Sequence, residues 1–214
     1  MGAEGSGRPL SGAARAAGGR ASDAASTDAS EPVRRIALVA VELADRDAAS
    51  VAAALSRRVA VPCELSSHRD VPRPPRVGQR AQHDADVLLR SIEAIDEPRG
   101  TVLVGVTALD LAIPIFTHVF GRAVLGGRVA LVSRARLAPE FYGQPPDPPL
   151  TLERTVTEIL HELGHVAGLG HCADRGCIMS FVPNVESLDL RGHGFCPVCE
   201  PLATRRIPLA LVAS

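Results

Sequence analysis

Residues 161–179 concentrate side chains that bind metal ions, in the order H-E-L-G-H-V-A-G-L-G-H-C-A-D-R-G-C-I-M. Because His161 and His165 are four residues apart, a helix places them on one face about 40° from each other, close enough to share one metal ion through neutral imidazole. Glu162 projects about 100° further round the helix, where it can take a proton from water activated by the metal. The spacing therefore predicts the site of a metal-dependent hydrolase.

A third histidine extends this motif. Gly168 follows His165 by three residues and allows the helix to end in a left-handed turn, after which His171 can supply a third ligand. Three nitrogen ligands leave one tetrahedral position open for water, the arrangement that separates catalytic zinc from structural zinc. A bare H-E-x-x-H also occurs by chance in solvated helices, but the added G-x-x-H makes chance a poor explanation.

Four cysteines form a second candidate metal site. They come as two pairs, Cys172 with Cys177 and Cys196 with Cys199. Four thiolates can close a tetrahedral zinc site with no open position, whereas two disulfide bonds are the alternative if the chain were exported. Because Cys172 adjoins His171, a metal on the cysteines would also hold the third histidine in place.

The composition favours one folded domain, residues 33–214, behind a disordered low-complexity tail, residues 1–32. A net charge of −1, the absence of Trp and an aromatic content of 3% disfavour nucleic acid as a partner. No apolar run approaches the ~20 residues that a membrane span requires, and no secretory signal is visible. We expect a cytoplasmic monomer without a membrane partner.

The apolar pattern predicts the strands and helices that must position the metal ligands. We expect a strand at 36–43, a helix at 46–59 capped by Asp45, strands at 61–67 and 101–106, and a second helix at 83–95. Cys63 falls in the second strand, as a small core residue rather than a reactive thiol. The alternation of strands and helices indicates an α/β fold.

Two further segments complete the predicted domain. Residues 120–125 and 128–132 are expected to form a hairpin around Gly126 and Gly127. The proline-rich stretch 137–149 predicts an irregular loop, and Thr151 then offers a cap for the helix that carries the histidines. Four apolar residues of this helix keep within about 60° of arc opposite the histidines: Val156, Leu160, Leu163 and Ala167. The helix is therefore expected to pack on the sheet while its ligands face a cleft.

The three-histidine motif followed by Met179 resembles the metzincin zinc peptidases. The C-I-M run ending at Met179 and the C-P-V-C run from Cys196 narrow the resemblance to the archaemetzincin family. The stretches 119–123, 133–137 and 140–143 are also similar to the family, so the resemblance covers about residues 33–200. It implies a zincin-like fold with a mixed β-sheet, packed helices, an active-site helix and a C-terminal segment held by zinc.

The resemblance also assigns roles to residues of this chain. It implies a catalytic zinc on His161, His165 and His171, with Glu162 as general base. It implies a structural zinc on Cys172, Cys177, Cys196 and Cys199. Met179 would lie in the Met-turn, an apolar floor beneath the histidines. An edge strand that contains Gly121, Arg122 and Ala123 would border the cleft and pair with an extended peptide.

We therefore predict a metallopeptidase with two zinc ions per chain and a peptide or protein substrate. Aminopeptidase and endopeptidase activity remain open. A zinc-stabilised peptide-binding module with little or no turnover is the alternative, although the intact Glu162 argues against it. A nucleic-acid-binding zinc ribbon is disfavoured by the net charge. His118 and His193 are candidate hydrogen-bond donors near the site, or else ordinary loop histidines.

Overall fold

The computed structural model describes residues 31–68 and 70–210. The predicted tail therefore lies outside the described residues, except for Glu31 and Pro32. The strands are β1 (Arg35–Val41), β2 (Cys63–Leu65), β3 (His83–Asp84), β4 (Thr101–Thr107), β5 (Leu111–Ala112), β6 (Gly121–Ala123) and β7 (Val129–Ser133). The helices are α1 (Asp45–Leu55), α2 (Ala85–Glu93), α3 (Pro148–Val166), α4 (Val185–Leu190) and α5 (Cys199–Thr204), with one 3-10 turn at Pro139–Tyr142.

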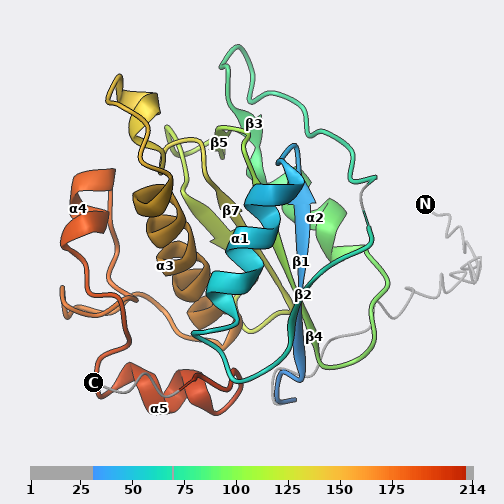
Figure 1. The fold of residues 1–214 in the computed structure, drawn as a ribbon, viewed down its shortest axis with the longest axis vertical. Helices are drawn as coiled ribbons and strands as arrows, with labels where there is room; N and C mark the ends of the chain where they lie inside the picture. The colour runs from blue at the N-terminus through green and yellow to red at the C-terminus, as the bar shows by residue number, and fades with distance from the viewer. Residues whose placement is uncertain (1–30, 69, 211–214) are drawn as a thin grey trace, which may run out of the picture.

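A five-stranded sheet in the order β2-β1-β4-β7-β6 forms the centre of the fold (Figure 1). The pairs β1–β2, β1–β4 and β4–β7 are parallel, whereas β6 runs antiparallel to β7 at the edge. The antiparallel pair is the predicted hairpin. A mixed sheet with packed helices confirms the predicted fold class.

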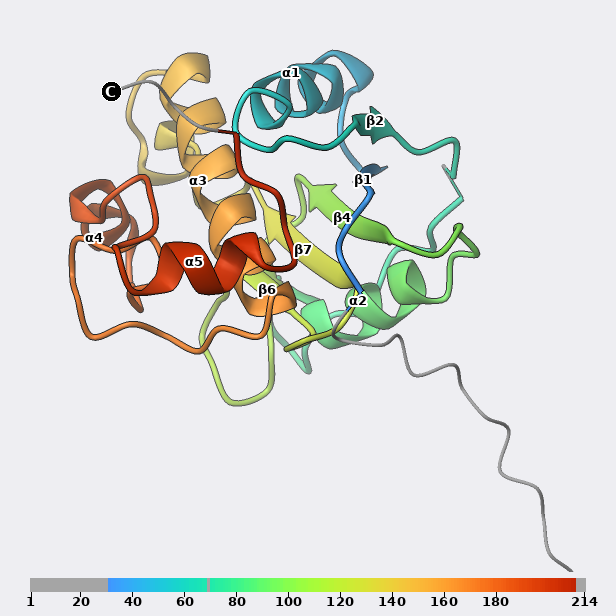
Figure 2. The ribbon, with the colours of Figure 1, turned by 90° about the horizontal axis from the view of Figure 1, so that it is seen from below.

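Helices cover both faces of this sheet. α1 and α3 lie on one face and α2 on the other (Figure 2). Because successive side chains of a strand point to opposite faces, Ile36 and Leu38 of β1 pack in the core shared with α1 and α3, while Ala37 and Val39 pack in the core shared with α2. β1 is buried on both faces, which explains its continuous apolar run.

The first two helices are shorter than predicted. α1 begins at Asp45 with Ala44 as its N-cap, so the prediction that Asp45 is the cap is wrong. α2 begins at Ala85 because the Asp84 carboxylate accepts a hydrogen bond from the Val87 N–H at 3.0 Å. His83, predicted to be helical, lies instead in β3, which pairs with β5.

The start of α3 also corrects the sequence prediction. Asp147, not Thr151, caps the helix, since the Asp147 carboxylate accepts a hydrogen bond from the Leu150 N–H at 3.0 Å. Pro148 and Pro149 occupy the first helical positions, where the N–H that proline lacks would be unpaired in any case. The expected loop before α3 is therefore shorter and contains the 3-10 turn.

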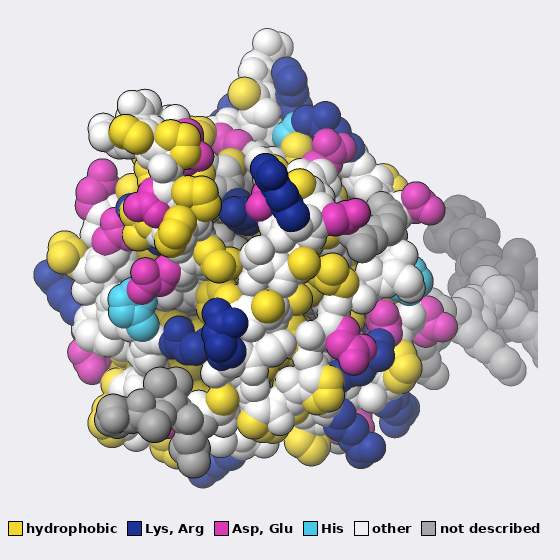
Figure 3. Space-filling view, in the orientation of Figure 1, with side chains coloured by type: hydrophobic (Ala, Val, Ile, Leu, Met, Phe, Trp, Pro, Cys, Tyr) yellow, Lys and Arg dark blue, Asp and Glu magenta, His cyan; other side chains and the backbone are white. Residues whose placement is uncertain are grey.

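The segment after Gly168 contains two short helices that were not predicted from the sequence. They are α4 and α5, which have six residues each and are too short to show a helical apolar period. On the face shown in Figure 3, acidic and basic side chains are interspersed rather than gathered into a field of one sign. No helix of the described residues is long and apolar enough to cross a bilayer.

Candidate metal centre and cleft

The end of α3 brings three histidines together. Gly168 has φ +92°, and its N–H donates to the His165 carbonyl at 2.9 Å while the Leu169 N–H donates to the Gly164 carbonyl at 3.0 Å. This is the left-handed helix end that the glycine predicts. The chain turns back, so that the ligand atoms of His161, His165 and His171 lie within 4.8 Å of one another. We call these three residues the histidine cluster.

Backbone carbonyls fix how two of these rings face the cluster. Nδ1 of His161 donates to the Ile178 carbonyl at 2.7 Å, and Nδ1 of His165 donates to the Leu169 carbonyl at 2.8 Å. The two Nε2 atoms are therefore left as acceptors, 3.1 Å apart. Tetrahedral zinc with bonds of about 2.0–2.1 Å requires about 3.3 Å between ligand nitrogens, so the pair fits a shared ion.

The surroundings of His161 and His171 favour the neutral imidazole, the form that binds a metal ion. Burial, helped by the positive charge of Arg191 and opposed by the negative charge of Glu158, lowers the pKa of His161 to about 4. Burial and the neighbouring His165 lower the pKa of His171. A neutral ring at physiological pH offers its lone pair to a cation without first losing a proton.

Glu162 is buried beside the histidine cluster and against the edge strand. A Cβ built on Gly121 of β6 would come within 2.7 Å of the Glu162 Cγ, so any other residue there would displace the Glu162 side chain or β6. Burial, and secondarily the charge of Glu158, raises the pKa of Glu162 well above its ordinary value. Its Oε2 has no hydrogen-bond partner among the described residues. A bound cation would oppose this rise and supply the missing partner.

The histidine cluster and Glu162 open into a cavity of about 620 Å³. Gly121, Arg122 and Ala123 of β6 line it, which agrees with the predicted place of the edge strand. β6 is the last strand of the sheet, so its outer edge has no strand partner among the described residues. An extended peptide could pair with such an edge.

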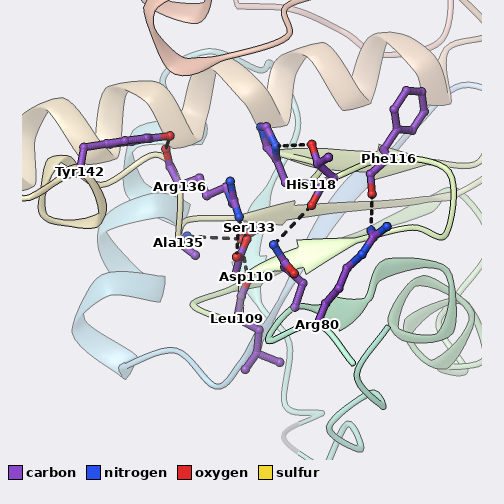
Figure 4. Close-up of polar contacts among 11 residues, drawn as sticks. Arg80, Leu109, Asp110, Phe116, His118, Ser133, Ala135, Arg136 and Tyr142 are labelled. Atoms are coloured by element: carbon purple, nitrogen blue, oxygen red, sulfur yellow. Dashed lines mark hydrogen bonds and ion pairs between the residues drawn. The ribbon is translucent and has the colours of Figure 1, made fainter. Parts of the chain in front are cut away.

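Residues 113–120, between β5 and β6, form one wall of this cavity. Figure 4 shows the polar contacts that hold the wall. Arg80 donates to the Phe116 carbonyl at 2.8 Å, and the Arg136 guanidinium pairs with Asp110 at 2.7 Å just before the wall begins. The wall is therefore anchored by arginines that lie outside the cavity lining.

Only one of the two additional histidines named from the sequence reaches the cavity. His118 lines it and packs edge-on against Phe120, with the ring centroids 5.2 Å apart. Burial and the charge of Arg136 lower the pKa of His118. His193 is exposed, lies 3.3 Å from the Thr157 hydroxyl and does not line the cavity.

Glu158 and Arg191 line the cavity as well, and neither was predicted from the sequence. Arg191 Nη2 lies 2.8 Å from Glu158 Oε2, and both side chains are buried. Glu158 stands one turn before Glu162 on α3, a spacing that could have drawn attention to it. Arg191 carries no such signal, because the turn after α4 that brings it to α3 belongs to no sequence motif.

The four cysteines of the C-terminal segment gather at a second point, next to the histidine cluster in the chain. The Sγ atoms of Cys172, Cys177, Cys196 and Cys199 lie within 4.8 Å of one another. We call them the cysteine cluster. Cys172 and Cys196 have their sulfurs 3.9 Å apart, and all five cysteines are free thiols. A disulfide bond requires about 2.05 Å, whereas tetrahedral zinc with Zn–S bonds of about 2.3 Å requires about 3.8 Å. The geometry fits a shared ion.

Backbone amides point at the sulfurs of the cysteine cluster. The Met179 and Cys196 N–H groups donate to Cys177 Sγ at 3.4 and 3.3 Å. The amides of Cys199 and Val198 lower the pKa of Cys196 to about 7, while burial raises the pKa of Cys177. Amide donors favour thiolates, the form that binds metal.

Met179 lies fully buried beneath α3. A Cβ on Gly164 would come within 3.0 Å of the Met179 Cε, so this helical glycine lets the methionine approach between the turns that carry His161 and His165. The Met179 carbonyl accepts the Cys172 N–H at 2.8 Å. Met179 therefore touches the histidine helix with its side chain and the cysteine cluster with its backbone.

Comparison with known proteins agrees with this arrangement. The model of Peptidase family M54 matches residues 80–205. The chain belongs to Peptidase family M54. The archaemetzincin of Methanocaldococcus jannaschii is 36% identical over 137 residues, which make up 64% of this chain and 74% of that relative.

Solved structures similar to this M54 peptidase are also archaemetzincins or zinc-dependent peptidases. The archaemetzincin of Archaeoglobus fulgidus, complexed with malonate, matches with a TM-score of 0.68 and 29% identity over 78% of this chain and 99% of that chain. A zinc-dependent peptidase from Methanocorpusculum labreanum matches with a TM-score of 0.64 and 28% identity over the same shares, 78% and 99%. These matches confirm the resemblance stated from the sequence, and this M54 chain is a zinc metallopeptidase.

Proposed function

We propose that the chain hydrolyses peptide bonds with one zinc ion on the histidine cluster and Glu162 as general base. A second zinc ion on the cysteine cluster holds the C-terminal segment. The observation that carries this proposal is the pair of histidine Nε2 atoms, which face each other at 3.1 Å inside a cavity that Glu162 also lines. Donor atoms of this kind at this separation suit a zinc ion with a free ligand position.

The histidine cluster would hold zinc, which when bound acts as a Lewis acid on a carbonyl and makes water acidic near neutral pH. Glu162 then takes the proton from the attacking water and passes it to the leaving amine. Burial suits Glu162 to this task, because a raised pKa strengthens the carboxylate as a base. The carbonyls of Ile178 and Leu169 keep the His161 and His165 rings oriented throughout.

The substrate would bind as an extended peptide along the outer edge of β6. Gly121 and Ala123 offer backbone groups on an edge that no strand of the described sheet covers, and both line the cavity. Backbone pairing would lay the scissile bond beside Glu162, against which Gly121 packs. Side-chain preference would come from the cavity walls.

The cysteine cluster would serve a different purpose. Four sulfur ligands leave no position for water, so this ion would act on stability and not on the substrate. Its first ligand, Cys172, is the neighbour of His171 and is tied to Met179 by a backbone hydrogen bond of 2.8 Å. The second ion would therefore steady the third histidine and the floor of the first site.

The test is metal analysis and peptide-library cleavage on the wild type and on Glu162→Gln. We expect two zinc ions per chain in both proteins and a loss of turnover of about 10²- to 10⁴-fold in the variant, the usual contribution of a general base. Unchanged cleavage in Glu162→Gln would contradict the proposed base. Zinc binding and peptide binding without cleavage in the wild type would favour a peptide-binding module instead.

A further inference from the structure

A buried ion pair lies in the wall of the cavity that holds the histidine cluster. Glu158 belongs to α3, and Arg191 follows the last residue of α4. Their side chains are 5% and 1% exposed, yet both residues line the cavity. The pair is part of the site and not of the molecular surface.

The Arg191 guanidinium connects three segments. Its Nη2 donates to Glu158 Oε2 at 2.8 Å, while its Nη1 donates to the Ser180 carbonyl at 3.4 Å and lies 3.1 Å from His161 Nδ1. Its Nε has no hydrogen-bond partner among the described residues. Because moving two charges out of water is costly, a buried pair that leaves one N–H unpaired is a weak way to stabilise a fold. Stability alone does not account for its place.

The position of Glu158 suggests what the pair prevents. Glu158 precedes Glu162 by four residues, so both carboxylates project from the same face of α3 and both line the cavity. Carboxylate oxygens, like imidazole nitrogens, are ligands of zinc in proteins. Without a cation of its own, a buried Glu158 would be drawn to the ion on the histidine cluster.

We propose that Arg191 is a positioning residue that holds the Glu158 carboxylate away from the ion on the histidine cluster, so that the fourth ligand position stays free for water. This inference rests on the proposed function of that cluster. The ion pair then limits the protein ligands of that ion to the three histidines. It follows that activity lost with Arg191 is lost because Glu158 becomes free to bind the ion.

The chain provides a matched control. Arg154 and Asp189 join the same two helices, with Nε to Oδ1 at 2.7 Å and Nη2 to Oδ2 at 2.5 Å. Neither residue lines the cavity of the histidine cluster. Asp189→Asn therefore weakens the contact between α3 and α4 without placing a carboxylate near the ion.

The experiment compares Arg191→Gln, the double variant Glu158→Gln with Arg191→Gln, and Asp189→Asn, each loaded with zinc. We expect Arg191→Gln to lower kcat by about 10- to 100-fold, the usual effect of losing a partner that orients a metal site, with little change in KM. The double variant should recover most of kcat, and Asp189→Asn should keep it. In a crystal structure of Arg191→Gln, a Glu158 oxygen should lie about 2.0–2.2 Å from the zinc.

Two results would overturn the inference. One is a double variant no more active than Arg191→Gln, and the other is a Glu158 carboxylate that stays away from zinc in the crystal structure of the single variant. If Arg191→Gln does not fold, Arg191→Met, which keeps a long side chain but removes the charge, carries the same comparison with and without Glu158→Gln. Wild-type cleavage that Glu162→Gln abolishes would show that the proposed function stands even where this inference fails.

Discussion

The histidine cluster and the cysteine cluster adjoin in the chain but differ in their surroundings. The histidines line a cavity of about 620 Å³, and His171 is exposed. The cysteines include the fully buried Cys177, and backbone amides surround its sulfur. Three ligands in a cavity leave room for a substrate, whereas four sulfurs around one point leave none. Access of substrate to the ion, more than the type of ligand, distinguishes a catalytic metal site from a structural one.

The strongest way to test this contrast is to remove a histidine ligand. His165→Ala takes away one of the two facing Nε2 atoms, so peptide hydrolysis should fall to background and one zinc ion per chain should be lost. The second ion should stay, since no cysteine is altered. Metal analysis beside a peptide-cleavage assay measures both. Retention of two zinc ions would contradict the role given to His165.

Removing a cysteine ligand should produce the complementary result. Cys177→Ser opens the buried corner of the cysteine cluster, so the structural ion should be lost together with about 4 kcal/mol or more of the free energy of unfolding. For a chain of this size the melting temperature should fall by about 10 °C. Thermal unfolding followed by circular dichroism checks this. A melting temperature equal to that of the wild type would show that the cysteine cluster does not contribute to the stability of the fold.

Gly121→Ala disturbs the histidine site without touching a ligand. The new Cβ would come within 2.7 Å of the Glu162 Cγ, which must push the carboxylate or β6 aside. A misplacement of about 1 Å can cost about 10²-fold in rate, so kcat/KM should fall by that order while both zinc ions remain bound. Gly194→Ala is the control, because a Cβ there meets no atom within 4 Å. Equal losses of kcat/KM in the two variants would show that the close contact between Gly121 and Glu162 is not what matters for the rate.

Cys172→Ser tests whether the two clusters are coupled. Cys172 belongs to the cysteine cluster but adjoins His171, and its N–H donates to the Met179 carbonyl at 2.8 Å. Loosening it should lower kcat by about 10-fold through His171 and make the zinc on the histidines easier to remove with a chelator. Full activity with normal zinc affinity at the histidines would show that the clusters act independently.

The parts of this site that sequence predicted share one property, which is that they are local. The three histidines, Glu162 and the turn at Gly168 lie within eleven residues, so the geometry of one helix and of the turn that ends it places them. The strands β1, β4 and β7 were also predictable, because they are buried on both faces and carry unbroken apolar runs.

The parts that sequence missed depend on contacts between distant segments. Arg191 reaches Glu158 across 33 residues, and β3 meets β5 through two residues on each side, too few for any period. The cap at Asp147 was missed because the prolines after it looked like loop, although proline suits the first turn of a helix. Distance in the chain hid the first two features, and the prolines hid the third.

The smallest expected effect concerns Cys63, the cysteine that belongs to neither cluster. It is half-buried in β2 rather than part of the core as expected, and burial raises the pKa of its thiol to about 11. At pH 8 only about 10⁻³ of this thiol is the reactive thiolate, so alkylation by iodoacetamide in the zinc-loaded protein should be slow. Its rate should rise about tenfold per pH unit while the pH stays below the pKa. Mass spectrometry locates the modified residue, and Cys63→Ser should abolish the slow phase without changing activity. Rapid alkylation of Cys63 at pH 7 would show that its thiol is reactive, and would reopen the question of a role for it.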